Sequence, residues 1–389
     1  MNFIPNITIT MKFLHLSDLH LGKRVHEISM LEDQAYILER ILKVIDDAHP
    51  DGIIIAGDVY DKSVPSSEAI TLFDDFLVSL SKRALQVFII SGNHDSPERL
   101  SFASRLIALS GIHIAPVYNG NVTPITLNDD YGRVSVYMLP FVKPANLRRF
   151  FEEENIETYT DAMRVAIKKM NPDYTERNIL ITHQFVTGAS RSESEEISVG
   201  GTDNIDASVL EGFDYVALGH LHKPQNCGND HIRYCGTPLK YSFSEARDRK
   251  SVTIIDIKEK NNISINTIPL LPLHDMHEIK GSYDELMSKS FYENTTYCTD
   301  YMHITLTDEL DVPDALGRLR TVYRNLMRLD YDNTRTRSTS EIISENNVEA
   351  QSPQELFSKF FYMQNNQELS DEQEKLLSNL IESIWEDKK

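Results

Sequence analysis

Potential metal ligands follow five of the predicted strands at the point where each strand ends. In each case a small residue ends the strand, and a ligand follows one or three positions after it. The five groups are Asp18 and His20 after Ser17, Asp58 after Gly57, Asn93 after Gly92, His183 after Thr182, and His220 and His222 after Gly219. In α/β sheets, ligands gather outside the carboxyl ends of the strands, so these groups can converge on one pocket.

Carboxylate, imidazole and amide ligands suit manganese, iron or zinc, and they argue against a calcium or thiolate site. Two-metal phosphoester hydrolysis needs ions ~3.5–4 Å apart that share a bridging ligand and clamp the phosphate. A water held between them would lose a proton near neutral pH and attack in line. We expect Asp58 to bridge the ions, with Asp18, His20 and His222 completing one site and Asn93, His183 and His220 the other.

His94 is the candidate catalytic residue. It follows Asn93 directly and so cannot easily bind the same ion. We expect it to stabilise charge on the phosphate or to protonate the leaving oxygen.

The elements that must position these side chains form an α/β layered domain. Residues 12 to about 270 alternate short apolar runs with helical spacing, which is typical of this class. The predicted strands are Lys12–Ser17, Gly52–Gly57, Gln86–Gly92, Val134–Pro140, Asn178–His183, Tyr215–Gly219, Ile232–Gly236 and Ser251–Ile257. The predicted helices are Leu31–Asp47, Ser66–Leu80 and Pro97–Leu109.

The pattern changes after residue 271. Residues 272–335 are interpreted as a small α/β domain with a strand at Tyr301–Leu306 and a basic helix at Val312–Leu329. Residues 336–351 are polar and are typical of a linker. Two amphipathic helices, Pro353–Gln364 and Ser370–Trp385, are predicted within residues 352–389. Residues 1–10 are interpreted as an extension that precedes a catalytic domain of residues 11–271.

The cysteine content, the apolar stretches and the net charge of the chain limit where the protein can act and what it can bind alone. The three cysteines form no Cys-x-x-Cys pair, which predicts a reducing cytoplasm and argues against a disulfide framework. No apolar stretch approaches the roughly 18–20 residues that a membrane span needs, and we expect no membrane association. The net charge of −20 counts against a free-standing DNA binder, because proteins that grip duplex DNA by themselves usually carry a basic face. Metals can neutralise the site carboxylates, and a partner subunit can supply the grip.

Several motifs resemble those of the calcineurin-like metallophosphoesterases. These are His15–His20, Gly57–Asp61, Gly92–Asp95 and Gly219–His222. Three longer stretches, Gly92–Ile107, Leu139–Pro144 and Tyr234–Glu245, look like the branch of bacterial SbcD nuclease subunits, which pair with the SMC-like ATPase SbcC.

The resemblance implies a sandwich of two mixed β-sheets flanked by helices, a small α/β capping domain that recognises DNA, and C-terminal helices that bind the SbcC coiled coil. It implies two divalent ions, manganese first, with magnesium, iron or zinc as alternatives. The activity implied is an exonuclease on duplex ends and an endonuclease on single strands and hairpins, coupled to ATP in DNA repair, recombination and replication. A homodimer within a heterotetramer is implied as well, through the helices at residues 66–80 and 97–109. Asp61 stands where some relatives carry histidine, and we expect it to orient His20 or a water.

Alternatives stay open at this point. A stand-alone metallophosphoesterase of small phosphodiesters or nucleotides would explain the metal motifs, and an adaptor that has lost its metals would retain the fold. Basic clusters could contact phosphates or be solvated surface: Arg148 and Arg149; Arg247, Arg249 and Lys250; and Arg318, Arg320, Arg324 and Arg328. The apolar stripes of the terminal helices could pack on the chain itself, although docking on a partner is favoured: Leu356, Phe357, Phe360 and Phe361; and Leu376, Leu380, Ile381 and Ile384.

Overall fold

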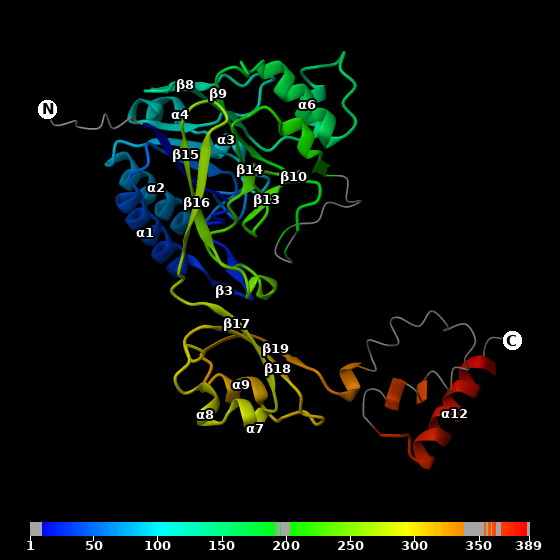
Figure 1. Cartoon of the computed structure of the whole chain (residues 1–389). Helices are drawn as coiled ribbons and strands as arrows, with labels where there is room; N and C mark the ends of the chain where they lie inside the picture. The colour runs from blue at the N-terminus through cyan, green and yellow to red at the C-terminus, as the bar shows by residue number, and fades with distance from the viewer. Residues whose placement is uncertain are drawn as a thin grey trace. The chain divides into compact units, whose positions relative to one another are not determined.

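The computed structural model describes residues 10–190, 192, 195, 203–337, 354, 357–358, 360–362 and 367–386. The chain divides into two compact units, Met1–Asp275 and Met276–Lys389. Figure 1 shows the strands and helices of both units.

Two six-stranded mixed sheets lie among the described residues of the larger unit (Figure 1). The first sheet has the order β16 (Ile263–Pro269), β15 (Ser251–Ile257), β1 (Met11–Leu16), β4 (Gly52–Ala56), β5 (Gln86–Ile90), β6 (Ile112–Ile114). The second has the order β13 (Gln225–Cys227), β14 (Asn229–Tyr234), β12 (Tyr215–Gly219), β9 (Arg177–His183), β8 (Gly132–Leu139), β7 (Ile125–Asp129). The strands β1, β4 and β5 are parallel, as are β9 and β12, so each set has its carboxyl ends at one edge.

The inner faces of the two sheets form one apolar core. Alternate residues of a strand point to the same face, and Phe13, Ile54 and Phe88 of the first sheet pack with Ile179 and Tyr215 of the second. All five side chains are fully buried. The predicted class, an α/β sandwich of two mixed sheets flanked by helices, is confirmed.

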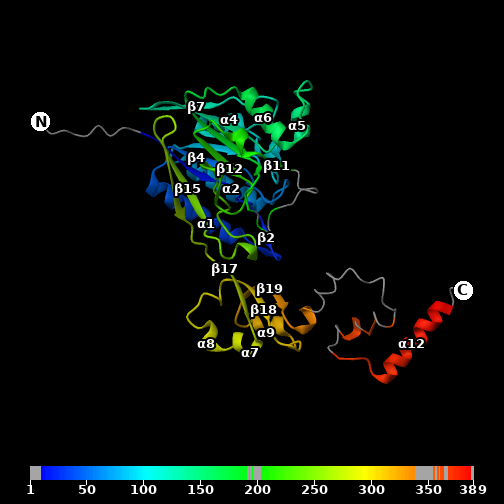
Figure 2. The same ribbon diagram turned by 45° about the vertical axis from the view of Figure 1, so that its right-hand side comes forward.

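Helices cover the outer faces. The helices α1 (Leu31–Ala48) and α2 (Ser67–Ser81) lie beside the first sheet (Figure 1). The helices α5 (Pro144–Arg148) and α6 (Tyr159–Met170) lie over the second (Figure 2), where apolar side chains of α6 join those of β8 and β9 in a second core. Ser66 caps α2 by accepting a hydrogen bond from the backbone N–H of Ala69, which is the usual use of serine at this position.

Short elements connect the layers. They are β2 (Arg24–Val25), β3 (Ile28–Ser29), β10 (Phe185–Val186), β11 (Asn204–Ile205), and the 3-10 turns η2 (Ala207–Leu210) and η3 (Phe243–Glu245).

The single helix predicted for Pro97–Leu109 is wrong. The segment forms α3 (Pro97–Leu100), α4 (Ser104–Ile107) and the 3-10 turn η1 (Ala108–Ser110). Ala103 has a φ of 59° in the left-handed region, which a continuous right-handed helix excludes. Phe102, Leu106 and Leu109 are exposed, so these apolar residues do not form a face buried within the chain.

The second unit contains a three-stranded parallel sheet of β17 (Met276–Gly281), β18 (Tyr301–Leu306) and β19 (Asn325–Tyr331). Its helices include α7 (Tyr283–Leu286), α8 (Lys289–Tyr292) and α9 (Ala315–Leu319). A further helical turn spans residues 334–337. The predicted strand at Tyr301–Leu306 is confirmed.

The basic helix predicted for Val312–Leu329 is wrong. Helix occupies only Ala315–Leu319, and the end of the stretch is the strand β19. The spacing of the apolar residues Leu326 and Leu329 is compatible with a helix or a strand. They form a strand because they pair in parallel with Met302 and Ile304 of β18.

The predicted helix Ser370–Trp385 is confirmed as α12 (Asp371–Glu386). The predicted helix Pro353–Gln364, the linker 336–351 and the N-terminal extension fall mostly outside the described residues. Among the described residues, no helix combines the length and the apolar character needed to cross a membrane.

Candidate metal centre

The structure brings all seven predicted ligands together at the carboxyl ends of β1, β4, β5, β9 and β12. The strand pairing places His183 directly beside Gly219, the residue before His220. Asp18, His20, Asp58, His183 and His222 are at most 2% exposed, and His220 is 9% exposed. Asn93 and His94 are half-buried and face the same cluster.

One half of the cluster brings together residues that follow β1 and β12. Ligand atoms of Asp18, His20 and His222 lie within 4.8 Å of one another. The Nε2 atoms of His20 and His222 are 3.2 Å apart, and the carboxylate of Asp18 accepts the backbone N–H of His220 at 3.0 Å. His20 and His222 are 202 positions apart in the chain.

The other half is built around Asn93. Its Oδ1 lies 2.9 Å from Nε2 of His183 and 3.0 Å from Nδ1 of His220. Asp58 lies between the halves, with Oδ2 at 3.3 Å from Nε2 of His183 and 3.8 Å from Nε2 of His20.

These donor atoms have the spacing of ligands that share a cation. Metal–ligand bonds of ~2.0–2.2 Å at right angles place neighbouring ligand atoms about 3 Å apart. The Nδ1 atom of His183 lies 2.9 Å from the carbonyl oxygen of Ala56, to which it donates. Its Nε2 therefore faces two acceptors, Asn93 Oδ1 and Asp58 Oδ2, and needs either a second proton or a cation beside it. The residues present fit a divalent metal.

Buried charges shift the pKa values in the cluster. Burial raises the pKa of Asp18 to about 6. Burial also lowers the pKa of His20 well below its ordinary value. For His183, burial acts downward, but the neighbouring Asp58 carboxylate raises its pKa to about 9. Burial disfavours the ionised form of Asp58, yet the charge and hydrogen bond of His183 hold the pKa of that carboxyl below its ordinary value.

Glycines before the ligands allow the strands to approach closely. A Cβ atom on Gly219 would lie 1.8 Å from the carbonyl oxygen of Ala56, and one on Gly92 would lie 2.1 Å from Oδ1 of Asp58. Both distances are far below van der Waals contact, so no larger residue fits without displacing the ligand-bearing loops. The glycines that precede Asn93 and His220 in the sequence thus have a steric cause.

His94 lies at the edge of the cluster. Its backbone N–H donates to Oδ1 of Asp58 at 2.9 Å, and its Nδ1 lies 3.0 Å from the carbonyl oxygen of Asp61. The side chain is 17% exposed, and its Nε2 is 4.0 Å from Oδ2 of Asp58. Ligand atoms of His20, Asp58 and His94 also lie within 4.8 Å of one another. The number of metal ions that a His94→Leu variant binds therefore decides whether His94 is a metal ligand or a catalytic residue.

Asp61 connects the site to a lysine that sequence reasoning missed. Its Oδ1 accepts a hydrogen bond from Nζ of Lys23 at 2.7 Å and lies 3.8 Å from Nδ1 of His20. The ammonium of Lys23 stands 5.6 Å from the ring centre of Tyr241, which in turn packs edge-on against His20.

Sequence reasoning also missed the groups around His222. Glu245 and Lys250 form a buried ion pair there, and Glu195 accepts the backbone N–H of His222. The available signal was the Tyr234–Glu245 motif, which ends on Glu245. Lys250 is 4% exposed, so neither alternative left open for it by the sequence, contact with phosphates or a solvated surface, holds. His15 lies outside the cluster: it is buried in β1, and its Nδ1 lies 2.9 Å from the hydroxyl of Tyr215.

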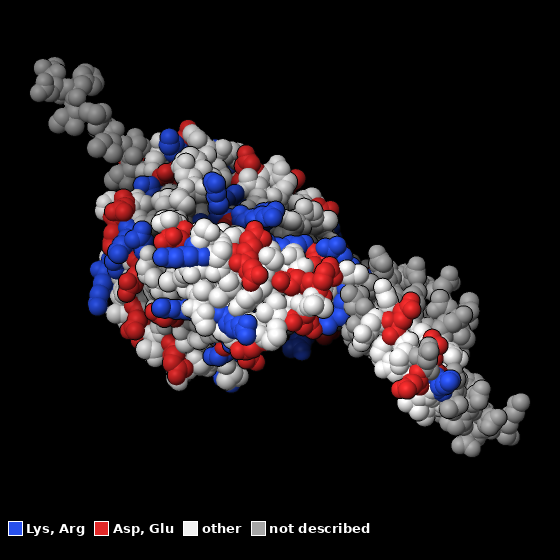
Figure 3. Space-filling model, turned by 90° about the horizontal axis from the view of Figure 1, so that it is seen from below, with Lys and Arg blue, Asp and Glu red and all other residues white. Residues whose placement is uncertain are grey.

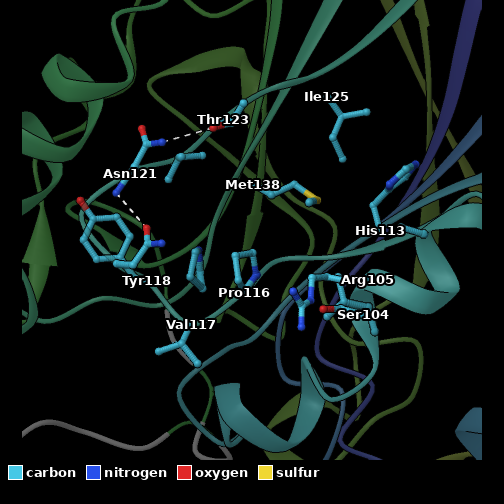
Figure 4. Close-up of a pocket in the computed structure, with 15 residues that line it drawn as sticks. Ser104, Arg105, His113, Pro116, Val117, Tyr118, Asn121, Thr123, Ile125 and Met138 are labelled. Atoms are coloured by element: carbon cyan, nitrogen blue, oxygen red, sulfur yellow. Dashed lines mark hydrogen bonds between the residues drawn. The ribbon is translucent and has the colours of Figure 1, made fainter.

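A cavity elsewhere in the larger unit is separate from this cluster. It has a volume of about 390 Å³ and lies among Arg105, His113, Tyr118 and Met138 (Figure 4). None of the seven candidate ligands lines it. His113 is held by Gln86 at 2.9 Å, so this cavity brings no second set of metal-binding groups together.

Comparison with known proteins agrees with the site. The family model for calcineurin-like phosphoesterases matches residues 11–224, and the model described as the type 5 capsule protein repressor C-terminal domain matches residues 272–365. The SbcD subunit of the nuclease SbcCD from Staphylococcus epidermidis is 32% identical over 96% of this chain and 99% of its own length. The same subunit from Staphylococcus saprophyticus is 32% identical over 97% of this chain and 99% of its own length.

Among solved structures, a dimetal phosphatase from Danio rerio is 10% identical, with a TM-score of 0.41 over 66% of this chain and 96% of its own. The chain belongs to the calcineurin-like phosphoesterase family, in the branch of the SbcD nuclease subunits.

Proposed function

We propose that this chain is the metal-dependent nuclease subunit of an SbcCD-type complex and hydrolyses phosphodiester bonds of DNA. The observation that carries the proposal is the buried cluster of carboxylate, imidazole and amide ligands at five strand ends. Relatives named as SbcCD nuclease subunits support it, since they match nearly the whole chain. A phosphoesterase that acts alone on small diesters would not explain the match over residues 272–365.

The metal centre we propose holds two divalent ions, manganese first. Asp58 would bridge them, because its carboxylate lies between the two halves of the cluster. The remaining ligands are Asp18, His20 and His222 for one ion and Asn93, His183 and His220 for the other. Such ions supply Lewis acidity to a phosphodiester and lower the pKa of water.

The chain's own residues then have distinct tasks. The carbonyl oxygen of Asp61 holds Nδ1 of His94, and this leaves Nε2 on the side of Asp58. From there the imidazole can donate to a phosphate oxygen or to the leaving oxygen. The Ala56 carbonyl fixes the proton of His183 on Nδ1, so that Nε2 points into the cluster.

The activity test compares substrates. Purified protein with Mn²⁺ is incubated with a hairpin duplex and with a chromogenic diester. Cleavage of the hairpin supports the nuclease. Hydrolysis of the small diester alone favours a stand-alone phosphoesterase of small phosphodiesters. Failure to bind any metal would support the adaptor hypothesis instead.

Proton release should accompany metal binding. The pKa of His183 is raised to about 9, so at pH 7 the metal-free protein carries a second proton on this imidazole, at Nε2. Nε2 must lose that proton before it can bind a metal. We expect about one proton released per chain at pH 7, and about a tenfold weaker Mn²⁺ affinity for each pH unit lowered. Below pH 6, protonation of Asp18 should steepen the dependence. Calorimetry in buffers of different ionisation enthalpy measures the release, and an affinity that stays constant from pH 6 to 8 contradicts this.

The working assembly we propose contains an SbcC-type ATPase, DNA and a second copy of this chain, in the cytoplasm. An apolar groove of about 750 Å³ between α2 and α3 supports the homodimer, since Ile70, Val78 and Phe102 are exposed along it. On the face that Figure 3 shows, Lys and Arg side chains are interspersed with Asp and Glu. With a net charge of −20, this mixed surface favours a partner that supplies much of the grip on DNA.

The C-terminal helix should dock on the ATPase partner. Leu376 and Leu380 are one helical turn apart on α12 and are 61% and 51% exposed. We expect deletion of residues 352–389, or the double change Leu376→Asp and Leu380→Asp, to weaken partner binding at least about 100-fold. Mn²⁺-dependent hydrolysis of a small diester should persist. Lys375→Ala on the same helix is the control, and partner binding that survives the truncation would contradict this role for the terminal helices.

A further inference from the structure

A buried ion pair lies next to His222. Nζ of Lys250 donates to Oε2 of Glu245 at 2.6 Å, and the two residues are 4% and 0% exposed. Glu245 ends the η3 turn, and Lys250 directly precedes β15. Burying two charges costs several kcal/mol, and apolar residues of similar volume often give equal or greater stability. Stability therefore does not by itself account for a charged pair at this position.

Both members of the pair contact His222. Oε1 of Glu245 lies 3.3 Å from Nδ1 of His222, and Nζ of Lys250 donates to the carbonyl oxygen of His222 at 2.8 Å. On the other side, Glu195 accepts the backbone N–H of His222 at 2.6 Å. The ring and both polar groups of the main chain are thus held, while Nε2 points toward His20.

The protonation of the imidazole follows from these partners. A carboxylate that is paired with an ammonium group is an acceptor only, and Oε2 of Glu245 is paired with Nζ of Lys250. The proton of neutral His222 must then lie on Nδ1, which leaves the lone pair on Nε2. Metal-binding histidines commonly donate their second nitrogen to a carboxylate, and this fixes the ring and raises its basicity.

We propose that Glu245, with Lys250 as its counter-ion, is a positioning residue that holds His222 in the orientation and tautomer needed to bind the metal. This inference rests on the proposed function, because it assumes that His222 is a ligand. The inference assigns a role to Glu245, the last residue of the Tyr234–Glu245 motif.

The test replaces the pair while keeping its volume. In E245L/K250M the pair becomes apolar, and His222 loses its acceptor. In E245Q/K250M the charges are also gone, but the amide oxygen can still accept from Nδ1. Both variants lack the ion pair, so a purely structural role predicts the same behaviour for both.

Mn²⁺ binding is measured by calorimetry and by electron paramagnetic resonance, below the unfolding temperature of every variant. We expect E245L/K250M to bind one of two Mn²⁺ ions about 10–100-fold more weakly than the wild type, and E245Q/K250M to recover most of that loss. The control is Asp129→Asn, which breaks another buried ion pair, with Arg177, that none of the candidate ligands contacts. It should lower the unfolding temperature and leave both Mn²⁺ affinities unchanged.

The outcomes separate the two proposals. If the wild type binds no Mn²⁺, the proposed function fails and this inference fails with it. If the wild type binds two ions and E245L/K250M binds both equally well, the inference alone is overturned. Equal losses in E245L/K250M and E245Q/K250M also overturn it, since they indicate a structural effect of the ion pair.

Discussion

Asp58→Ala is expected to abolish phosphodiester hydrolysis and to remove bound metal from both halves of the cluster. The Asp58 carboxylate is 3.3 Å from Nε2 of His183 and 3.8 Å from Nε2 of His20, so it is the group shared by the two halves. Without it, two cations at ~3.5–4 Å lose the anion that offsets their repulsion. We expect the rate to fall at least about 10⁴-fold, which corresponds to about 5.5 kcal/mol.

Metal content and hairpin cleavage are measured on the same preparation. Asp214→Asn is the matched control, because Asp214 is also a buried carboxylate but lies before β12, at the opposite end of the strand from His220. It pairs with Lys260 and accepts the backbone N–H of Asn178, so its loss should cost stability only. An Asp58→Ala protein that keeps two metals contradicts the bridging assignment.

The convergence of the ligands could be predicted because the end of each buried strand can be recognised from the local sequence. Each buried strand is a short apolar run, and the polar residue after it must lie at the strand's carboxyl end. Parallel pairing then brings His183 beside Gly219, and β1 beside β4, at one edge. The glycines before Asn93 and His220 made the strand ends visible, for the steric reason that a Cβ at either position would collide with the neighbouring loop.

The errors arose where tertiary contacts outweigh local pattern. Leu326 and Leu329 have spacing compatible with a helix, yet pairing with β18 makes the segment a strand. Lys250 stands beside two arginines in sequence, but its ammonium is buried against Glu245. Nothing in the spacing of Glu245 and Lys250 indicates that η3 and β15 place them against His222. Such partners are defined by three-dimensional packing, which a periodicity of side chains along the chain does not encode.

His94→Leu is expected to separate metal binding from catalysis. The imidazole of His94 is held by the Asp61 carbonyl. Its Nε2 is 4.0 Å from Oδ2 of Asp58, compared with 3.8 Å for Nε2 of His20 and 3.3 Å for Nε2 of His183. Leucine removes the proton donor and retains a side chain of similar bulk, while the backbone N–H that donates to Asp58 is unchanged. We expect hydrolysis to fall about 10²–10⁴-fold with two metals still bound.

A proton-donating role also makes a claim about the substrate, and this distinguishes it from a merely structural one. A diester with a nitrophenol leaving group needs little protonation, so the defect of His94→Leu should be smaller on it than on DNA, whose leaving oxygen is far more basic. His113→Leu is the matched control, since His113 is half-buried and hydrogen-bonded to Gln86 away from the cluster. Loss of metal in His94→Leu would place His94 among the ligands, as its 4.8 Å grouping with His20 and Asp58 allows. Retention of two ions with a leaving-group-dependent defect identifies it as the group that transfers the proton.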